Sequence, residues 1–109
     1  MEANIKWIDG VNFSALTESG NTILMDGPVE NGGNNNGSRP TELLISGMGG
    51  CTAFDIVCMA KTKKIKIKNF NLKINAQRTN SKPSLINKIH CTYIIDSDEK
   101  NKDDLEKII

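Results

Sequence analysis

The chain of 109 residues is long enough for one small folded domain, and its composition excludes several broad classes of protein. Fourteen basic residues nearly balance thirteen acidic ones, giving a formal net charge of +1, so we expect no nucleic acid as a partner. We also expect no membrane: we find no run of about eighteen apolar residues, and the N-terminus lacks the pattern of a signal peptide.

Three short strands are predicted first, over residues 4–9, 12–18 and 21–26. Asp9-Gly10 and Ser19-Gly20-Asn21 between them are typical of hairpin turns. The next stretch, residues 27–38, is rich in glycine and asparagine and has few bulky side chains. We expect it to be a disordered connector, with a mobile lid as the alternative.

A long apolar helix is predicted from Pro40 to Lys63 or Lys64. Proline suits the first position of a helix, and Glu42 falls in the first turn, where the helix dipole favours an acid. Apolar residues then recur at steps of three and four over a wide face, so we expect this helix to be central to the fold.

Three glycines immediately precede the cysteine at the middle of this helix. Gly47, Gly49 and Gly50 stand just before Cys51, and each costs about 1 kcal/mol relative to alanine inside a helix. Such a cost indicates that bare backbone is useful here. It would allow either the close packing of another helix or the approach of a substrate to the sulfur.

Two longer strands and a second helix are predicted in the rest of the chain. The strands cover residues 67–78 and 85–95, and residues 96–99 are expected to end the second strand and to cap a final helix that begins near Asp103. This order predicts an α+β fold in which a sheet covers the central helix.

The segment from Arg39 to Asp55 resembles the OsmC/Ohr family. It contains Pro-x-Glu-Leu-Leu, then Gly-Gly-Cys-Thr, and an acid four residues after the cysteine. Residues 81–90 are similar to the family's connection into its next strand. The resemblance implies a single OsmC-like domain over residues 1–109 and an intertwined homodimer with reactive cysteines near the subunit interface.

The resemblance also implies a chemistry. In enzymatic members the helix cysteine attacks a peroxide O–O bond, an arginine and a glutamate position or activate its thiolate, and a second, late cysteine resolves the sulfenic acid as a disulfide. Cys51 matches the helix cysteine, and Arg39 and Glu42 are the candidates for the other two catalytic residues. The late cysteine is absent, so either the chain is shortened at its C-terminus or the protein works without it.

The positions of Glu42 and Arg39 depart from the family pattern. The family's glutamate lies ten residues before the cysteine, where this chain has Thr41, whereas Glu42 lies nine before it. Nine residues at 100° each place Glu42 opposite Cys51 on the helix, so only a second subunit would bring it close. The alternatives are a helix-start acid for Glu42 and a solvated loop residue for Arg39.

The remaining cysteines and the histidine suggest no metal site and no cofactor. The three cysteines and His90 lack zinc-ligand spacing, and unpaired cysteines are typical of the cytoplasm. We expect Cys58 to lie in the core and Cys91 to pack within a strand, or else to serve as an improvised resolving thiol. His90 should point to the opposite face of that strand from Cys91.

The leading hypothesis is therefore a thiol-dependent redox protein that reduces organic hydroperoxides through Cys51. The apolar neighbours Leu44, Met48 and Phe54 favour an organic substrate, and an external thiol would reduce the sulfenic acid. The alternative is a non-catalytic homodimer that binds a small apolar ligand or a protein partner. A shortened and purely structural chain is the third hypothesis.

Overall fold

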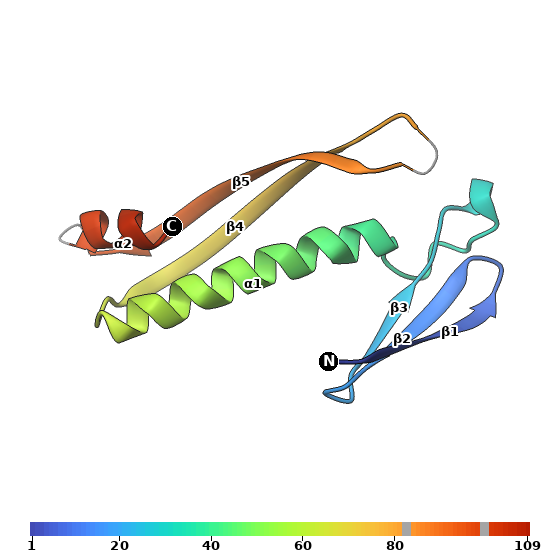
Figure 1. Cartoon of the computed structure of the whole chain (residues 1–109), viewed down its shortest axis with the longest axis horizontal. Helices are drawn as coiled ribbons and strands as arrows, with labels where there is room; N and C mark the ends of the chain where they lie inside the picture. The colour runs from blue at the N-terminus through green and yellow to red at the C-terminus, as the bar shows by residue number, and fades with distance from the viewer. Residues whose placement is uncertain (82–83, 99–100) are drawn as a thin grey trace. The chain divides into compact units, whose positions relative to one another are not determined.

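The computed structural model describes residues 1–81, 84–98 and 101–109, and the chain divides into two compact units, Met1–Leu44 and Ile45–Ile109. The first unit contains the predicted N-terminal strands, and the second contains most of the long helix and the later elements (Figure 1). Parts of two predicted features, residues 82–83 of the 81–90 connection and Glu99 of the helix cap, lie outside the described residues.

The first unit is built on a three-stranded antiparallel sheet. It comprises β1 (Ala3–Asp9), β2 (Asn12–Thr17) and β3 (Thr22–Met25), paired in chain order. The glycine of the first predicted turn, Gly10, has a φ of +48°, a value that glycine adopts without strain. The three strands and both turns are confirmed, with ends within two residues of the prediction.

The segment after β3 is ordered rather than a disordered connector, so that expectation is wrong. It contains a short 3₁₀ helix, η1 (Val29–Asn31), and it returns to the sheet where Ser38 pairs with Met25. Asp26, which directly follows β3, is only 1% exposed and lies beneath residues 27–37, to which it is hydrogen-bonded.

The Asp26 carboxylate accepts three hydrogen bonds from backbone N–H groups of this segment. Gly27 donates to Oδ1 at 2.7 Å, and Asn34 and Asn36 donate to Oδ2 at 3.2 and 3.1 Å. The N–H groups of Asn31, Gly32, Gly33 and Asn35 donate to backbone carbonyl oxygens of the same segment. A glycine-rich and asparagine-rich segment is therefore ordered by its own turns together with one buried carboxylate.

The second unit places a helix alongside a two-stranded hairpin (Figure 1). Helix α1 runs over Pro40–Thr62, and the antiparallel strands β4 and β5 run over Ile67–Arg78 and Ile86–Ser97. The last element, α2, covers Lys102–Ile108. These elements confirm the predicted α+β class and the order of its parts.

The end of β5 differs from the prediction. The strand continues to Ser97, two residues beyond the predicted end, because Ser97 pairs with Ile67 and its Oγ donates to the Lys66 carbonyl oxygen at 2.8 Å. The residue that precedes α2 is Asn101, and its side chain makes no capping hydrogen bond. The polar residues Asp96 and Ser97 therefore extend the hairpin instead of capping the final helix.

The core of the second unit lies where α1 ends and α2 packs back. Its buried residues are Ala60, Ile65 and Leu105, with Ile67, Ile95 and Ile108 packed around them. Along its whole length α1 buries only Gly49, Ile56 and Ala60, which lie on one narrow stripe. Most of this apolar helix is therefore exposed in the single chain.

The composition of α1 corrects the expectation that no segment is apolar enough to cross a membrane. An 18-residue window of the helix has a mean hydropathy of 1.7, and only 17% of that window is buried. A single helix of this kind is weak support for a membrane span, because the central helix of a soluble protein meets the same standard of length and composition.

Candidate functional site

Arg39 and Glu42 lie together at the start of α1, where they cap the helix. The Glu42 Oε1 accepts a hydrogen bond at 2.7 Å from the backbone N–H of Arg39, the residue before Pro40. This reach from the third helical position to the residue before the helix is one half of a capping box. The helix-start role considered for Glu42 is therefore present in the structure.

The Arg39 side chain is engaged by the ordered segment that precedes the helix. Its Nη1 donates to the Asn35 Oδ1 at 2.8 Å, and the Gly37 carbonyl oxygen lies at 3.5 Å. Asn35 has a φ of +55°, which asparagine tolerates better than most residues. The guanidinium is thus hydrogen-bonded to polar loop atoms at the surface.

Arg39 also contributes to the electrostatics of Asp26. Burial works to raise the pKa of Asp26, but hydrogen bonds from Gly27, Asn36 and Asn34 and the positive charge of Arg39 outweigh it, so the pKa lies below its usual value of 3.8. The carboxylate is therefore ionised under ordinary conditions and holds its loop as an anion.

Cys51 lies on the side of α1 that turns away from the β4–β5 hairpin. The thiol is free and exposed, so this structure does not bury it as an inert core residue. Gly49, two residues earlier, is buried against the hairpin, and two helical steps rotate the next side chain by about 200°. Cys51 consequently points away from its own sheet.

Four residues of α1 follow one another along this exposed side, and we call them the open face: Gly47, Cys51, Phe54 and Cys58. Their spacing of four, three and four residues is the spacing of a seam between packed helices. Phe54 is 70% exposed, and a Cβ atom on Gly47 would meet nothing within 4 Å. The expectation that Cys58 lies in the core is wrong, because it shares this exposed face with Cys51.

The opposite side of α1 packs closely against β4. A Cβ atom on Gly49 would fall 2.6 Å from the Ile74 Cδ1, so any larger residue here would force the Ile74 side chain to shift. Cys91 pairs with Ile74 across the hairpin, and residues paired in this way share a face of the sheet. Half-buried Cys91 is therefore on the helix-facing side, as expected for strand packing, and adjacent His90 falls on the other face.

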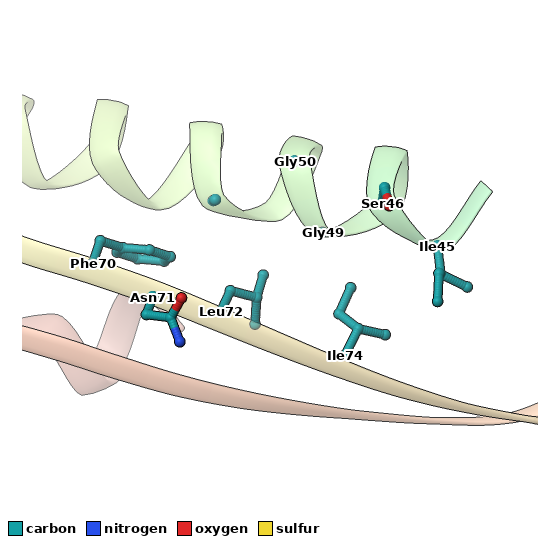
Figure 2. A pocket seen from close by; sticks show the side chains of 9 residues that line it. Ile45, Ser46, Gly49, Gly50, Phe70, Asn71, Leu72 and Ile74 are labelled. Atoms are coloured by element: carbon teal, nitrogen blue, oxygen red, sulfur yellow. The ribbon is translucent and has the colours of Figure 1, made fainter. Parts of the chain in front are cut away.

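A cavity lies between α1 and β4 within the second unit. Figure 2 shows Phe70, Leu72 and Ile74 on β4 facing the stretch of α1 that contains Gly49 and Gly50. The cavity has a volume of about 400 Å³, in the range of small-molecule sites. Its lining is completed by Ile45, Ser46, Ala53 and Asn71.

The site thus has two parts on the two sides of one helix. The glycines near Cys51 lie on both sides: Gly49 and Gly50 line the cavity, whereas Gly47 belongs to the open face.

Asp26 is the residue that was not predicted from the sequence. Its position at the end of a strand looked ordinary, although backbone amides in a segment outside the sheet need acceptors, and a neighbouring carboxylate can supply them.

The chain is an α+β protein with an exposed thiol. Its central helix carries the cysteine, packs on an antiparallel hairpin and follows a three-stranded sheet in the sequence. The chain belongs to the OsmC-like protein family, whose sequence profile it matches over residues 32–109. It is 32% identical over 98 residues to Protein YhfA of Escherichia coli strain K12, with 87% of this chain and 68% of that protein covered.

Solved structures show the same fold. An OsmC-like protein of unknown function from Vibrio cholerae superposes with a TM-score of 0.74 at 10% identity, covering 98% of this chain and 82% of that one. A hypothetical protein from Aquifex aeolicus VF5 gives a TM-score of 0.77 at 23% identity, covering 98% of this chain and 74% of that one. These likenesses confirm the fold that was predicted from the family resemblance around Cys51.

Proposed function

We propose that this protein reduces organic hydroperoxides through the thiolate of Cys51, as a cytoplasmic homodimer that is returned to its reduced state by an external thiol. The observation that supports it best is the exposed position of Cys51 on an apolar helix face, in a chain of the OsmC-like family. A peroxide has direct access to this sulfur, and neighbouring Met48 and Phe54 favour an organic group over water.

The same apolar face supports the homodimer. Leu44, Met48 and Phe54 are 57%, 45% and 70% exposed in one chain, which is costly for large apolar side chains. A two-fold interface uses one patch on both copies, so a second chain would cover this face on each copy at once. Small residues at Gly47 and Cys51 would let the two helices approach closely.

The experiment for the proposed function is to trap the oxidised sulfur. Reduced protein is exposed briefly to limiting cumene hydroperoxide in the presence of dimedone, and the labelled peptide is identified by mass spectrometry. We expect fast labelling at Cys51, its loss in Cys51→Ser, and no change in the matched control Cys91→Ser. Slow labelling spread over all three cysteines would contradict the proposal.

The cavity supports a second candidate, the binding of a small apolar ligand without catalysis. Its volume of about 400 Å³ and its lining by Phe70, Leu72 and Ile74 suit a hydrocarbon group. Titration with n-octanol, followed by backbone amide NMR shifts, tests this candidate. We expect Ala53→Phe to fill the cavity and abolish the shifts, whereas Thr52→Phe, one residue away and outside the lining, should retain them.

A further inference from the structure

Cys51 has no disulfide partner within its own chain. Cys58 is seven residues further along the same face, a rise of about 10 Å, which exceeds the Cα separation of any disulfide. Cys91 lies on the sheet face that meets Gly49, whereas Cys51 points away from that sheet. The two exposed thiols of the open face are thus each left without a partner of the same chain.

We propose that Cys58 of a second copy is the resolving thiol for Cys51. The inference rests on the proposed function and names the partner of that same site. If two α1 helices pack antiparallel across a two-fold axis midway between residues 51 and 58, each Cys51 faces the other copy's Cys58. Symmetry then places two identical thiol pairs in one interface.

The dimensions of packed helices suit this pairing. Helix axes pack about 8–10 Å apart, and each Cα lies about 2.3 Å from its axis, so directly facing Cα atoms are about 3.4–5.4 Å apart, and the wider packings give the longer distance. That distance falls at the lower end of the range for disulfides, about 4.4–6.8 Å. The close approach needs small residues on the seam, and three of the four residues of the open face are glycine or cysteine.

A second copy of α1 is the occupant that fits this face. None of the four residues of the open face is charged, although exposed Asp55 borders it, and the four repeat with the period of a helix seam. An antiparallel copy would also place opposite ends of the two helix dipoles together. These features favour α1 of a second copy as the partner that packs on the open face.

The chemistry proceeds in two balanced steps. The Cys51 thiolate attacks the terminal oxygen of the hydroperoxide, the O–O bond breaks, the alkoxide leaves and takes up a proton, and the sulfur becomes a sulfenic acid. The Cys58 thiolate of the second copy then attacks that sulfur, the S–S bond forms, and the S–O bond breaks, with the hydroxide taking up a proton from solvent to leave as water. An external dithiol restores both thiols by exchange.

Two variants, each lacking one thiol of the proposed pair, test the pairing. Cys51→Ser and Cys58→Ser are each treated with limiting cumene hydroperoxide, separately and after mixing under conditions that exchange subunits, and then alkylated and run on non-reducing gels. We expect no covalent dimer from either variant alone and a covalent dimer from the mixture. Peptide mapping should find Cys51 joined to Cys58, and Cys91→Ser should behave as the unmodified protein.

The outcomes separate this inference from the proposed function. Sulfenic acid at Cys51 without the cross-link, or a cross-link between two Cys51 residues, would overturn the inference and leave peroxide reduction standing. If peroxide oxidises nothing, the disulfide-forming reagent diamide tests the pairing alone. A Cys51–Cys58 cross-link with diamide would retain the thiol pair and reject the peroxidase, and its absence with both reagents would overturn the inference.

Discussion

Gly49 of α1 and Ile74 of β4 are in direct contact, so closely that a Cβ atom on the glycine would fall 2.6 Å from the Ile74 Cδ1. This contact sets the distance between the helix and the hairpin. It also explains one of the costly glycines near Cys51 by packing, whereas Gly47 meets nothing within the chain.

The first prediction concerns these two glycines. We expect Gly49→Val to lower the free energy of unfolding by about 2 kcal/mol, because the new side chain overpacks the contact with Ile74. The matched change Gly47→Ala should raise it by up to about 1 kcal/mol through better helix propensity. Urea unfolding of dilute protein measures both, and equal destabilisation by the two changes would contradict the assigned packing.

The second prediction separates capping from catalysis at Glu42. Glu42→Gln keeps an oxygen that accepts from the Arg39 N–H, so stability and Cys51 oxidation should both be retained, whereas Glu42→Ala should cost about 1 kcal/mol. Thermal unfolding and dimedone labelling measure the two properties. If Glu42→Gln folds normally but no longer oxidises Cys51, the glutamate has the catalytic role that the family resemblance implies.

The sequence predicted the elements of the fold well because local signals mark them. Pro40 starts α1, and Gly10 permits the first turn, each for a conformational reason that can be seen in the chain itself. The family motif around Cys51 then supplied the arrangement of the elements.

The parts that were predicted wrongly depend on contacts between distant residues. The order of residues 27–37 comes from hydrogen bonds to Asp26 up to ten residues away, and glycine-rich composition alone predicts disorder. The exposure of Cys58 follows from how little of α1 the hairpin covers. An apolar helical pattern cannot tell a face buried by the same chain from a face left open.

The third prediction is a pH dependence that depends on Asp26. Its pKa is lowered in the folded state, so its contribution to stability is present above about pH 3.8 and is lost as the pH falls through the lower folded value. Stability should therefore fall steeply below that pH in the unmodified protein. We expect Asp26→Asn to melt several degrees lower than the unmodified protein near neutral pH, and its melting temperature to change less as the pH is lowered below about 4. Melting temperatures that fall equally with pH in the two proteins would contradict the assignment.

The fourth prediction concerns the proposed homodimer. We expect Phe54→Asp to yield monomers in analytical ultracentrifugation, because it places a charge on the open face that the second copy would cover. Ile94→Asp is the control, since Ile94 is also exposed but lies on the face of β5 opposite to Cys91, away from α1. Dissociation by both changes to the same extent, or by neither, would argue against this face as the interface.

The buried carboxylate of Asp26 has a consequence for the dynamics of the loop that it holds. Backbone amides in a segment without regular structure ordinarily exchange with solvent deuterium quickly. The N–H groups of Gly27, Asn34 and Asn36 are bound to a side chain that water does not reach. These three amides should therefore exchange slowly although they lie outside any helix or strand, and they should become fast together when the carboxylate is removed.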